Sequence, residues 1–183
     1  MHVFETVHDI LKFNGKKKPY KVTISVDGKN YTNGDMLKKV TTLVEFLKKS
    51  KVSSGDRIAF LAKNSSEFIE LMYASSFLEL VLVPINFRLA YTEVKFIIQD
   101  SCSKIIIFGE EFKEIIEELN TDKTELELSI GIGELRKLCR EKGTVGLDIS
   151  RSSNNGSNIP LFQMYTSGTT GNPKGALISQ KGI

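Results

Sequence analysis

The residues of this chain that are best suited to chemistry lie in one short run, Tyr-Thr-Ser-Gly-Thr-Thr-Gly-Asn-Pro-Lys-Gly, at residues 165–175. The run contains three glycines, four Ser or Thr hydroxyls and one lysine. Glycines allow successive backbone N–H groups to converge on an anion. The hydroxyls can donate to phosphate oxygens or ligate Mg²⁺, and the lysine supplies a point positive charge. The composition of this run therefore predicts a loop that binds polyphosphate.

Two other loops of known chemistry do not fit these residues. A Walker P-loop places Gly-Lys-Ser/Thr together at the start of a helix. Here Pro173 precedes Lys174, Gly175 follows it, and residues 176–179 have the character of a strand. A serine nucleophile elbow needs glycine two positions before its serine, and Ser167 lacks one. We therefore expect neither a P-loop NTPase nor a serine hydrolase.

The complete string at residues 165–175 resembles the phosphate loop of the acyl-adenylate-forming (AMP-binding) superfamily, which includes acyl-CoA synthetases, luciferases and peptide-synthetase adenylation domains. It matches the family signature Tyr-Thr-Ser-Gly-Thr-Thr-Gly-x-Pro-Lys-Gly at every fixed place. Residues 55–59 (Gly-Asp-Arg-Ile-Ala), 64–68 (Asn-Ser-Ser-Glu-Phe) and 83–89 (Val-Pro-Ile-Asn-Phe-Arg-Leu) are similar to family segments and follow in the same order. One departure is Glu79-Leu80, where the family usually has Gly-Ala. A glutamate at a place of close backbone packing is expected to cost stability.

The resemblance also implies an activity and roles for individual residues. Enzymes of this family activate a carboxylate with ATP and Mg²⁺ to give acyl-AMP and pyrophosphate, and then usually transfer the acyl group to a thiol such as CoA. By this resemblance Thr166 assists Mg²⁺ and Lys174 balances the charge of pyrophosphate. The residues implied to contact the ATP phosphates are Thr166, Ser167, Gly168, Thr169, Thr170, Gly171 and Lys174. No residue of the chain is assigned to catalysis itself.

The Thr169-Thr170 pair and residues 83–89 resemble acyl-CoA synthetases most, which implies a fatty or other acyl acid as substrate and CoA as co-substrate. The family's later acidic Mg²⁺ ligand, ribose-binding aspartate, adenine-contacting segment and small carboxyl-terminal domain have no counterpart in residues 1–183. We therefore expect an amino-terminal portion of a synthetase/ligase domain that is inactive by itself. The alternative is a non-catalytic nucleotide-binding remnant of such an enzyme.

The elements that must position this loop can be predicted from apolar periodicity. Short strands that are apolar on both faces alternate with helices of 10 to 15 residues, which indicates βαβ units and a parallel sheet. Strands are predicted at 57–62, 81–85, 104–108, 145–149 and 161–165, helices at 4–13, 33–50, 65–78, 92–99, 111–119 and 134–142, a hairpin at 21–31, and a linker at about 150–158. Ser65 and Thr92 are expected as helix caps. The predicted fold is α/β, a layered, parallel-rich sheet with flanking helices and an exposed edge, as in a truncated adenylate-forming enzyme.

Composition narrows the class of protein further. The 183 residues are 40% hydrophobic and 26% charged with a net charge of +3, and the scattered lysines do not indicate nucleic-acid binding. Cys102 and Cys139 make no disulfide framework, and His2 and His8 cannot anchor a metal cluster. The chain shows neither a signal peptide nor an apolar run of about 18 residues. We expect a cytoplasmic protein whose partners are small molecules (ATP, a carboxylic acid and CoA), without a transmembrane segment.

Overall fold

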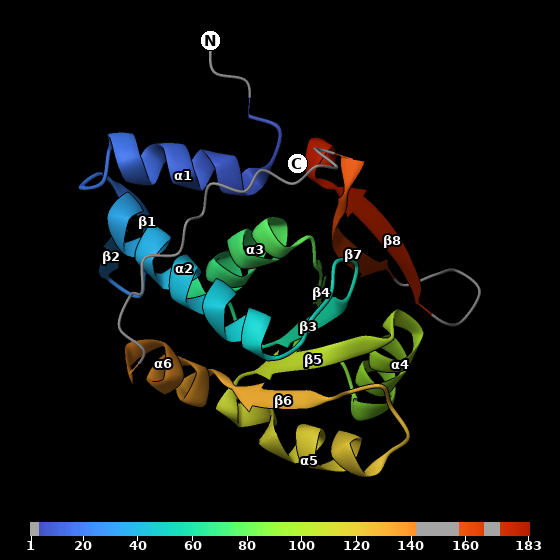
Figure 1. Ribbon diagram of the computed structural model, residues 1–183. Helices are drawn as coiled ribbons and strands as arrows, with labels where there is room; N and C mark the ends of the chain where they lie inside the picture. The colour runs from blue at the N-terminus through green and yellow to red at the C-terminus, as the bar shows by residue number, and fades with distance from the viewer. Residues whose placement is uncertain (1–3, 142–157, 167–172) are drawn as a thin grey trace.

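The computed structural model describes residues 4–141, 158–166 and 173–183 (Figure 1). Six strands form one sheet in the order β6-β5-β3-β4-β7-β8, and β1 and β2 form a separate hairpin. The strands are β1 (Val22–Val26), β2 (Lys29–Thr32), β3 (Arg57–Leu61), β4 (Val81–Pro84), β5 (Ser103–Phe108), β6 (Leu128–Gly131), β7 (Pro160–Thr166) and β8 (Lys174–Ser179). The helices are α1 (Val7–Lys17), α2 (Asn33–Lys49), α3 (Ser66–Leu78), α4 (Tyr91–Ser101), α5 (Lys113–Thr121) and α6 (Ile132–Glu141), with short 3₁₀ turns η1 (Glu110–Phe112) and η3 (Gln180–Gly182).

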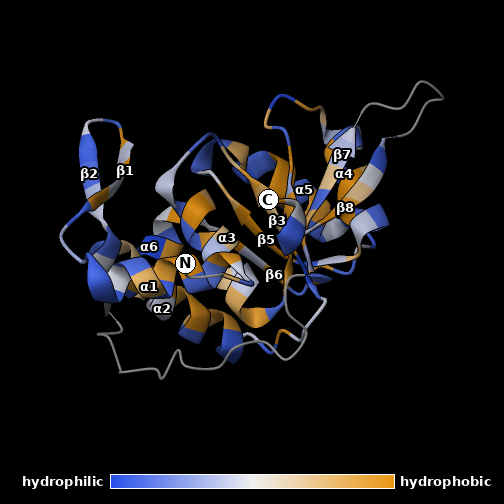
Figure 2. Cartoon of the chain, turned by 90° about the horizontal axis from the view of Figure 1, so that it is seen from above, coloured by the Kyte–Doolittle hydropathy of each residue, from blue (hydrophilic) through white to orange (hydrophobic). Residues whose placement is uncertain are grey.

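The central strands bury side chains on both faces. In β3, Ile58 and Phe60 belong to the cluster formed with α1, α2, α3 and α6. Ala59 and Leu61 belong to the cluster formed with α4 and α5 on the opposite face. All neighbours in the large sheet are parallel except β7 and β8, which are antiparallel. The predicted α/β fold with a parallel-rich sheet and flanking helices is therefore confirmed, and Figure 2 shows the β1–β2 hairpin standing apart from these layers.

Most of the predicted elements are confirmed, but one strand was missed. β6 lies in the segment for which the sequence predicted neither helix nor strand. It pairs with β5 over four residues, of which Leu128 and Ser129 are only half-buried. A strand this short, with a polar residue in its middle, has too weak an apolar pattern to be recognised from sequence. The predicted strand at 145–149 and nearly all of the predicted linker (150–157) lie outside the described residues.

One of the two predicted helix caps is correct in position. Ser65 is the N-cap residue of α3, although its side chain makes no capping hydrogen bond. The prediction for Thr92 was wrong. The N-cap of α4 is Ala90, not Thr92, and its backbone N–H donates to the Glu93 carboxylate at 2.9 Å. A carboxylate three residues into the helix thus does the capping that was expected of a hydroxyl.

The first helix also differs from its prediction. It runs from Val7 to Lys17 rather than over residues 4–13. Its buried residues are His8, Leu11 and Gly15, whereas Ile10 is exposed. The burial of His8 is accompanied by hydrogen bonds to Ser76 of α3, a segment distant in sequence.

Glu79, the departure from the family pattern, ends helix α3 in the left-handed region, with a φ of +59°. Its carbonyl accepts a hydrogen bond from the Gly55 backbone at 2.8 Å, and its carboxylate accepts one from the Ser54 hydroxyl at 2.8 Å. The next residue, Leu80, is fully buried. The conformation that favours glycine is therefore retained here by a residue with a side chain, at a cost in backbone strain.

We predict that Glu79→Gly raises the free energy of unfolding by roughly 0.5–1 kcal/mol, because relief of left-handed strain outweighs the larger unfolded-state entropy of glycine. Chemical denaturation of both proteins measures the change. The control is Ser54→Ala, which removes the hydrogen-bond partner of Glu79 and leaves its φ alone. A glycine variant less stable than the parent would show that the Ser54 contact outweighs the strain.

Candidate phosphate-binding site

Two polar residues of the predicted loop, Thr166 and Lys174, lie in the described part of the chain, and the structure places them opposite each other. Thr166 ends β7, Lys174 begins β8, and the two are partners in the antiparallel ladder (Figure 1). Both residues are exposed. The other residues predicted to bind ATP phosphates, namely Ser167, Gly168, Thr169, Thr170 and Gly171, lie outside the described residues. The hairpin thus brings a hydroxyl and an ammonium group, eight positions apart in sequence, to the same place.

In the part of the chain that the structure describes, the side chains of Thr166 and Lys174 are not bonded to other side chains. No ion pair or hydrogen bond to another described side chain holds the Lys174 ammonium or the Thr166 hydroxyl. Directly opposed residues of an antiparallel pair have their Cβ atoms about 4.5–5.5 Å apart on the same face. A single anionic group at the end of this hairpin could therefore contact both side chains.

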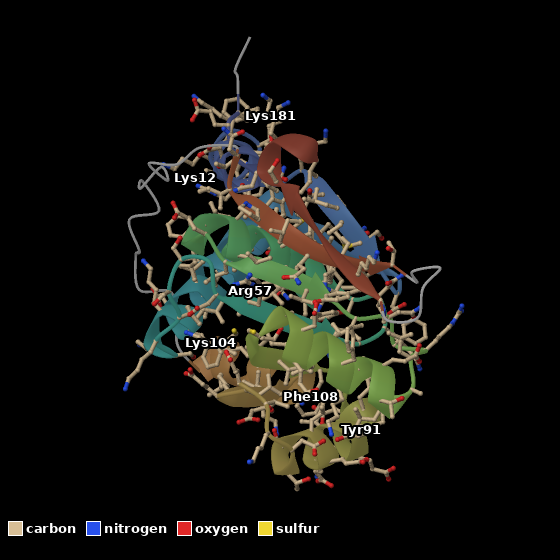
Figure 3. The ribbon with its side chains drawn as sticks, turned by 90° about the vertical axis from the view of Figure 1, so that its right-hand side faces the viewer. Lys12, Arg57, Tyr91, Lys104, Phe108 and Lys181 are labelled. Atoms are coloured by element: carbon tan, nitrogen blue, oxygen red, sulfur yellow. The ribbon has the colours of Figure 1, made fainter. Side chains whose placement is uncertain are left out.

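The position of this pair in the sheet also suits ligand binding. Because β7 runs parallel to β4, Thr166 lies at the edge where the parallel strands have their carboxyl ends. Figure 3 shows Arg57 and Lys104, near the amino ends of β3 and β5, on the left, and Tyr91, at the start of α4, on the right. In open α/β sheets, ligands bind outside the carboxyl ends of the strands.

Tyr165, which directly precedes Thr166, ties this end of β7 to helix α4. Its hydroxyl donates to the Asp100 carboxylate at 2.5 Å and accepts a hydrogen bond from the Gln163 amide at 2.8 Å. Burial and the Asp100 carboxylate both raise the pKa of Tyr165 well above its usual value. The phenol is therefore a neutral, fixed donor, and its contact holds the strand that leads into the loop.

Gly175, which follows Lys174, provides space for the same contact. A Cβ atom at this position would lie 2.7 Å from the Gln163 amide nitrogen and 2.9 Å from the Tyr165 ring. Gly175 is the ladder partner of Tyr165, so these side chains cross over its backbone. The sequence indicated that Gly175 belongs to the loop but did not identify Gln163 or Asp100. Gln163 and Tyr165 are two positions apart on β7, and this spacing could have predicted that their side chains share a face of the sheet.

A separate cavity of about 620 Å³ lies between the β1–β2 hairpin and helices α2, α3 and α6. No residue of the predicted phosphate loop is among its described lining residues. Two pairs of its charged groups are bonded to each other: Arg136 donates two hydrogen bonds to Glu67, and Lys39 donates one to Glu70. Burial would raise the pKa of Glu67, but the Arg136 hydrogen bonds prevail and lower it to about 2. Nothing in the amino-acid sequence indicated this cavity or the pairing of Glu67 with Arg136.

A mostly parallel six-stranded sheet with helices packed on both faces defines the chain as an α/β protein. Residues 11–183 match the family of AMP-binding enzymes, and the chain belongs to that family. It is 36% identical over 72% of its length to a long-chain-fatty-acid–CoA ligase, FadD13, of Mycobacterium tuberculosis, and 27% identical over 97% to a fatty acid–acyl-carrier-protein ligase, ScoC, of Streptomyces coeruleorubidus. It covers 26% and 33% of those proteins, respectively. The chain thus spans about a third, or less, of the length of these curated relatives.

Solved structures agree with this assignment. An inhibitor-bound crystal structure of the N-terminal domain of FACL13 from Mycobacterium tuberculosis is 30% identical with a TM-score of 0.85, covering 97% of this chain and 45% of that one. An anthranilate CoA ligase, AuaEII, in complex with anthranoyl-AMP is 22% identical with a TM-score of 0.87, covering 99% and 35%. At that identity the likeness shows the fold alone. Within the described residues, no helix is long and apolar enough to cross a membrane.

We predict that Gly175→Ala lowers the free energy of unfolding by about 1–3 kcal/mol, because the new methyl group meets Gln163 and Tyr165 at less than van der Waals distance. Thermal or chemical denaturation measures the loss. Gly182→Ala is the matched control, since its Cβ would meet no atom closer than 3.4 Å. Equal stability of the two alanine variants would contradict a steric role for Gly175.

Proposed function

We propose that this chain supplies the polyphosphate-binding part of an enzyme that activates a carboxylic acid with ATP to give acyl-AMP. The acyl group is then passed to a thiol such as CoA. The observation that carries the proposal is the pairing of Thr166 with Lys174, both exposed, at the mouth of the glycine-rich loop. Family membership supports it, because the matching family binds AMP. We propose further that residues 1–183 bind polyphosphate without completing the reaction.

The positive charge of Lys174 complements the negative charge that the reaction creates on pyrophosphate. When a carboxylate attacks the α-phosphorus of ATP, the bond to the bridging oxygen breaks and pyrophosphate leaves with additional negative charge. The Lys174 ammonium neutralises part of that charge as a point cation. The backbone N–H groups of residues 167–172, together with the hydroxyls of Ser167, Thr169 and Thr170, are proposed to hold the β- and γ-phosphates.

Thr166 is the described residue best suited to assist Mg²⁺. Magnesium takes oxygen ligands, and in nucleotide sites it usually combines substrate phosphates and water with one or two protein oxygens. The ion supplies charge neutralisation and holds the phosphates in one geometry. The hydroxyl of Thr166 lies on the strand opposite Lys174, so the hairpin presents a neutral oxygen ligand and a cation side by side.

The acceptor thiol and the acid are proposed from the relatives. The two curated relatives described above, FadD13 and ScoC, are named as ligases of fatty acids, with CoA and an acyl-carrier protein as the respective acceptors. Another, from Amycolatopsis, is a feruloyl-CoA synthase 30% identical over 90% of this chain, which covers 31% of it. These names support an acyl or aryl acid as substrate and a carrier thiol as acceptor. We propose a fatty or other acyl acid, with ATP, Mg²⁺ and CoA as the small-molecule partners.

We predict that Lys174→Met weakens binding of magnesium pyrophosphate by roughly tenfold or more, because a hydrogen bond to a charged group contributes about 1.5–3 kcal/mol. Isothermal titration calorimetry of the 183-residue chain measures the dissociation constant. Lys181→Met is the matched control, since Lys181 is an exposed lysine in η3, beyond the opposite end of β8 (Figure 3). Equal weakening in both variants would mean only that net charge matters, and no weakening in either would refute the proposed site.

A further inference from the structure

A buried polar cluster lies at the end of β8 that is far from the loop. Gln180, the first residue of η3, is 5% exposed and bonds to Ser76 of α3, which in turn bonds to His8 of α1; Ser76 and His8 are 0% and 2% exposed. We call these three side chains, with the backbone N–H of Val7, the Gln180 socket. It joins segments that are 104 and 173 positions apart in sequence. No role in the reaction proposed above uses these residues.

The hydrogen atoms of the Gln180 socket can be placed from its geometry. The Val7 backbone N–H donates to Gln180 Oε1 at 3.1 Å, which fixes the orientation of the amide. Ser76 Oγ lies 2.5 Å from the same oxygen and therefore donates its only hydrogen to it. His8 Nδ1 lies 2.9 Å from Ser76 Oγ, so it must carry the hydrogen of that bond.

The backbone N–H of His8 donates to the same Ser76 oxygen at 3.1 Å. Burial lowers the pKa of His8 to about 4, against the attraction of Asp9, so its ring is neutral near pH 7. Two hydrogen bonds of the Gln180 socket end on the amide oxygen of Gln180, and the two from His8 end on Ser76 Oγ. Removal of the amide oxygen would leave the part-buried Val7 N–H and the hydrogen of the buried Ser76 hydroxyl without an acceptor.

Few side-chain contacts fix the register of strand β8. It is the edge strand, with β7 as its neighbour among the described strands, and its first four residues are exposed. Register is weakly specified where neither face of a strand is buried. The ladder also has an irregularity between Pro160 and Phe162. A slip of one residue would turn Lys174 to the other face of the sheet and away from Thr166.

We propose that Gln180 is a positioning residue for the phosphate site: its buried amide oxygen, held by Val7 and Ser76, fixes the register of β8 and so keeps Lys174 opposite Thr166. The inference rests on the proposed function for its consequence in binding, but the register itself can be measured without any ligand. Gly175 limits register at the loop end, because only glycine fits opposite Tyr165. The Gln180 socket limits it at the other end.

Two variants of the 183-residue chain test this role. Gln180→Met keeps the size of the side chain and removes the acceptor oxygen. Lys181→Met places methionine at the exposed neighbouring position of η3. For each we measure amide hydrogen exchange of the β8 residues by NMR without ligand, and then the affinity for magnesium pyrophosphate.

We expect Gln180→Met to speed exchange of the β8 amides that bond to β7 by about tenfold and to weaken pyrophosphate binding by a similar factor. Lys181→Met should remain within about twofold of the parent. Unchanged exchange in Gln180→Met would overturn the register role, and faster exchange with unchanged affinity would overturn the positioning role. If the parent chain itself fails to bind pyrophosphate while exchange responds as expected, the proposed function fails and the register role stands. Ser76→Ala removes the same hydrogen bond from the α3 side, and it serves as an independent test if Gln180→Met does not fold.

Discussion

The antiparallel pairing of β7 with β8 is the interaction on which the candidate site depends. It sets Thr166 against Lys174 and Tyr165 against Gly175, and it determines which face of the sheet each side chain occupies. Side chains alternate between faces along a strand, so a change of register would separate the ammonium from the hydroxyl without removing either residue. The chemistry of the loop is therefore limited by strand register as much as by residue type.

The rest of the sheet holds β7 in place by burial, whereas β8 is held by specific contacts. β7 pairs in parallel with β4, whose strand core is buried between helices on both faces. β8 has mostly exposed side chains, and it is fixed by the space that Gly175 leaves and by the buried amide of Gln180. Tyr165 adds a bond from β7 to Asp100 of α4. The site thus combines a well-buried platform with an edge strand whose position depends on a few polar and steric contacts.

The sequence predicted those parts of the structure that local pattern determines. The central strands were recognisable because they are apolar on both faces, and the helix at Asn33–Lys49 because its apolar residues recur at helical spacing. The loop was recognisable because its glycines, hydroxyls and lysine form a continuous string. The sequence also singled out Glu79 as a departure from the family's Gly-Ala pair, and in the structure this residue has the left-handed conformation that favours glycine.

The parts that could not be predicted depend on contacts between distant segments. A histidine near the amino end gives no sign that it will be buried against Ser76, and Asp100 gives no sign that it will accept from Tyr165. Strand β6 was missed because its four residues carry too short an apolar pattern, and its pairing with β5 identifies it as a strand.

The central claim is that polyphosphate binds at the mouth of the β7–β8 hairpin and not in the 620 Å³ cavity beside α2 and α3. A titration of the ¹⁵N-labelled chain with magnesium pyrophosphate, followed by amide chemical shifts, tests it most directly. We expect saturable changes in the amide chemical shifts of residues 165–175, with those of Tyr31 and Arg136 unaffected. Shifts centred on Tyr31 and Arg136, with the hairpin unchanged, would contradict it.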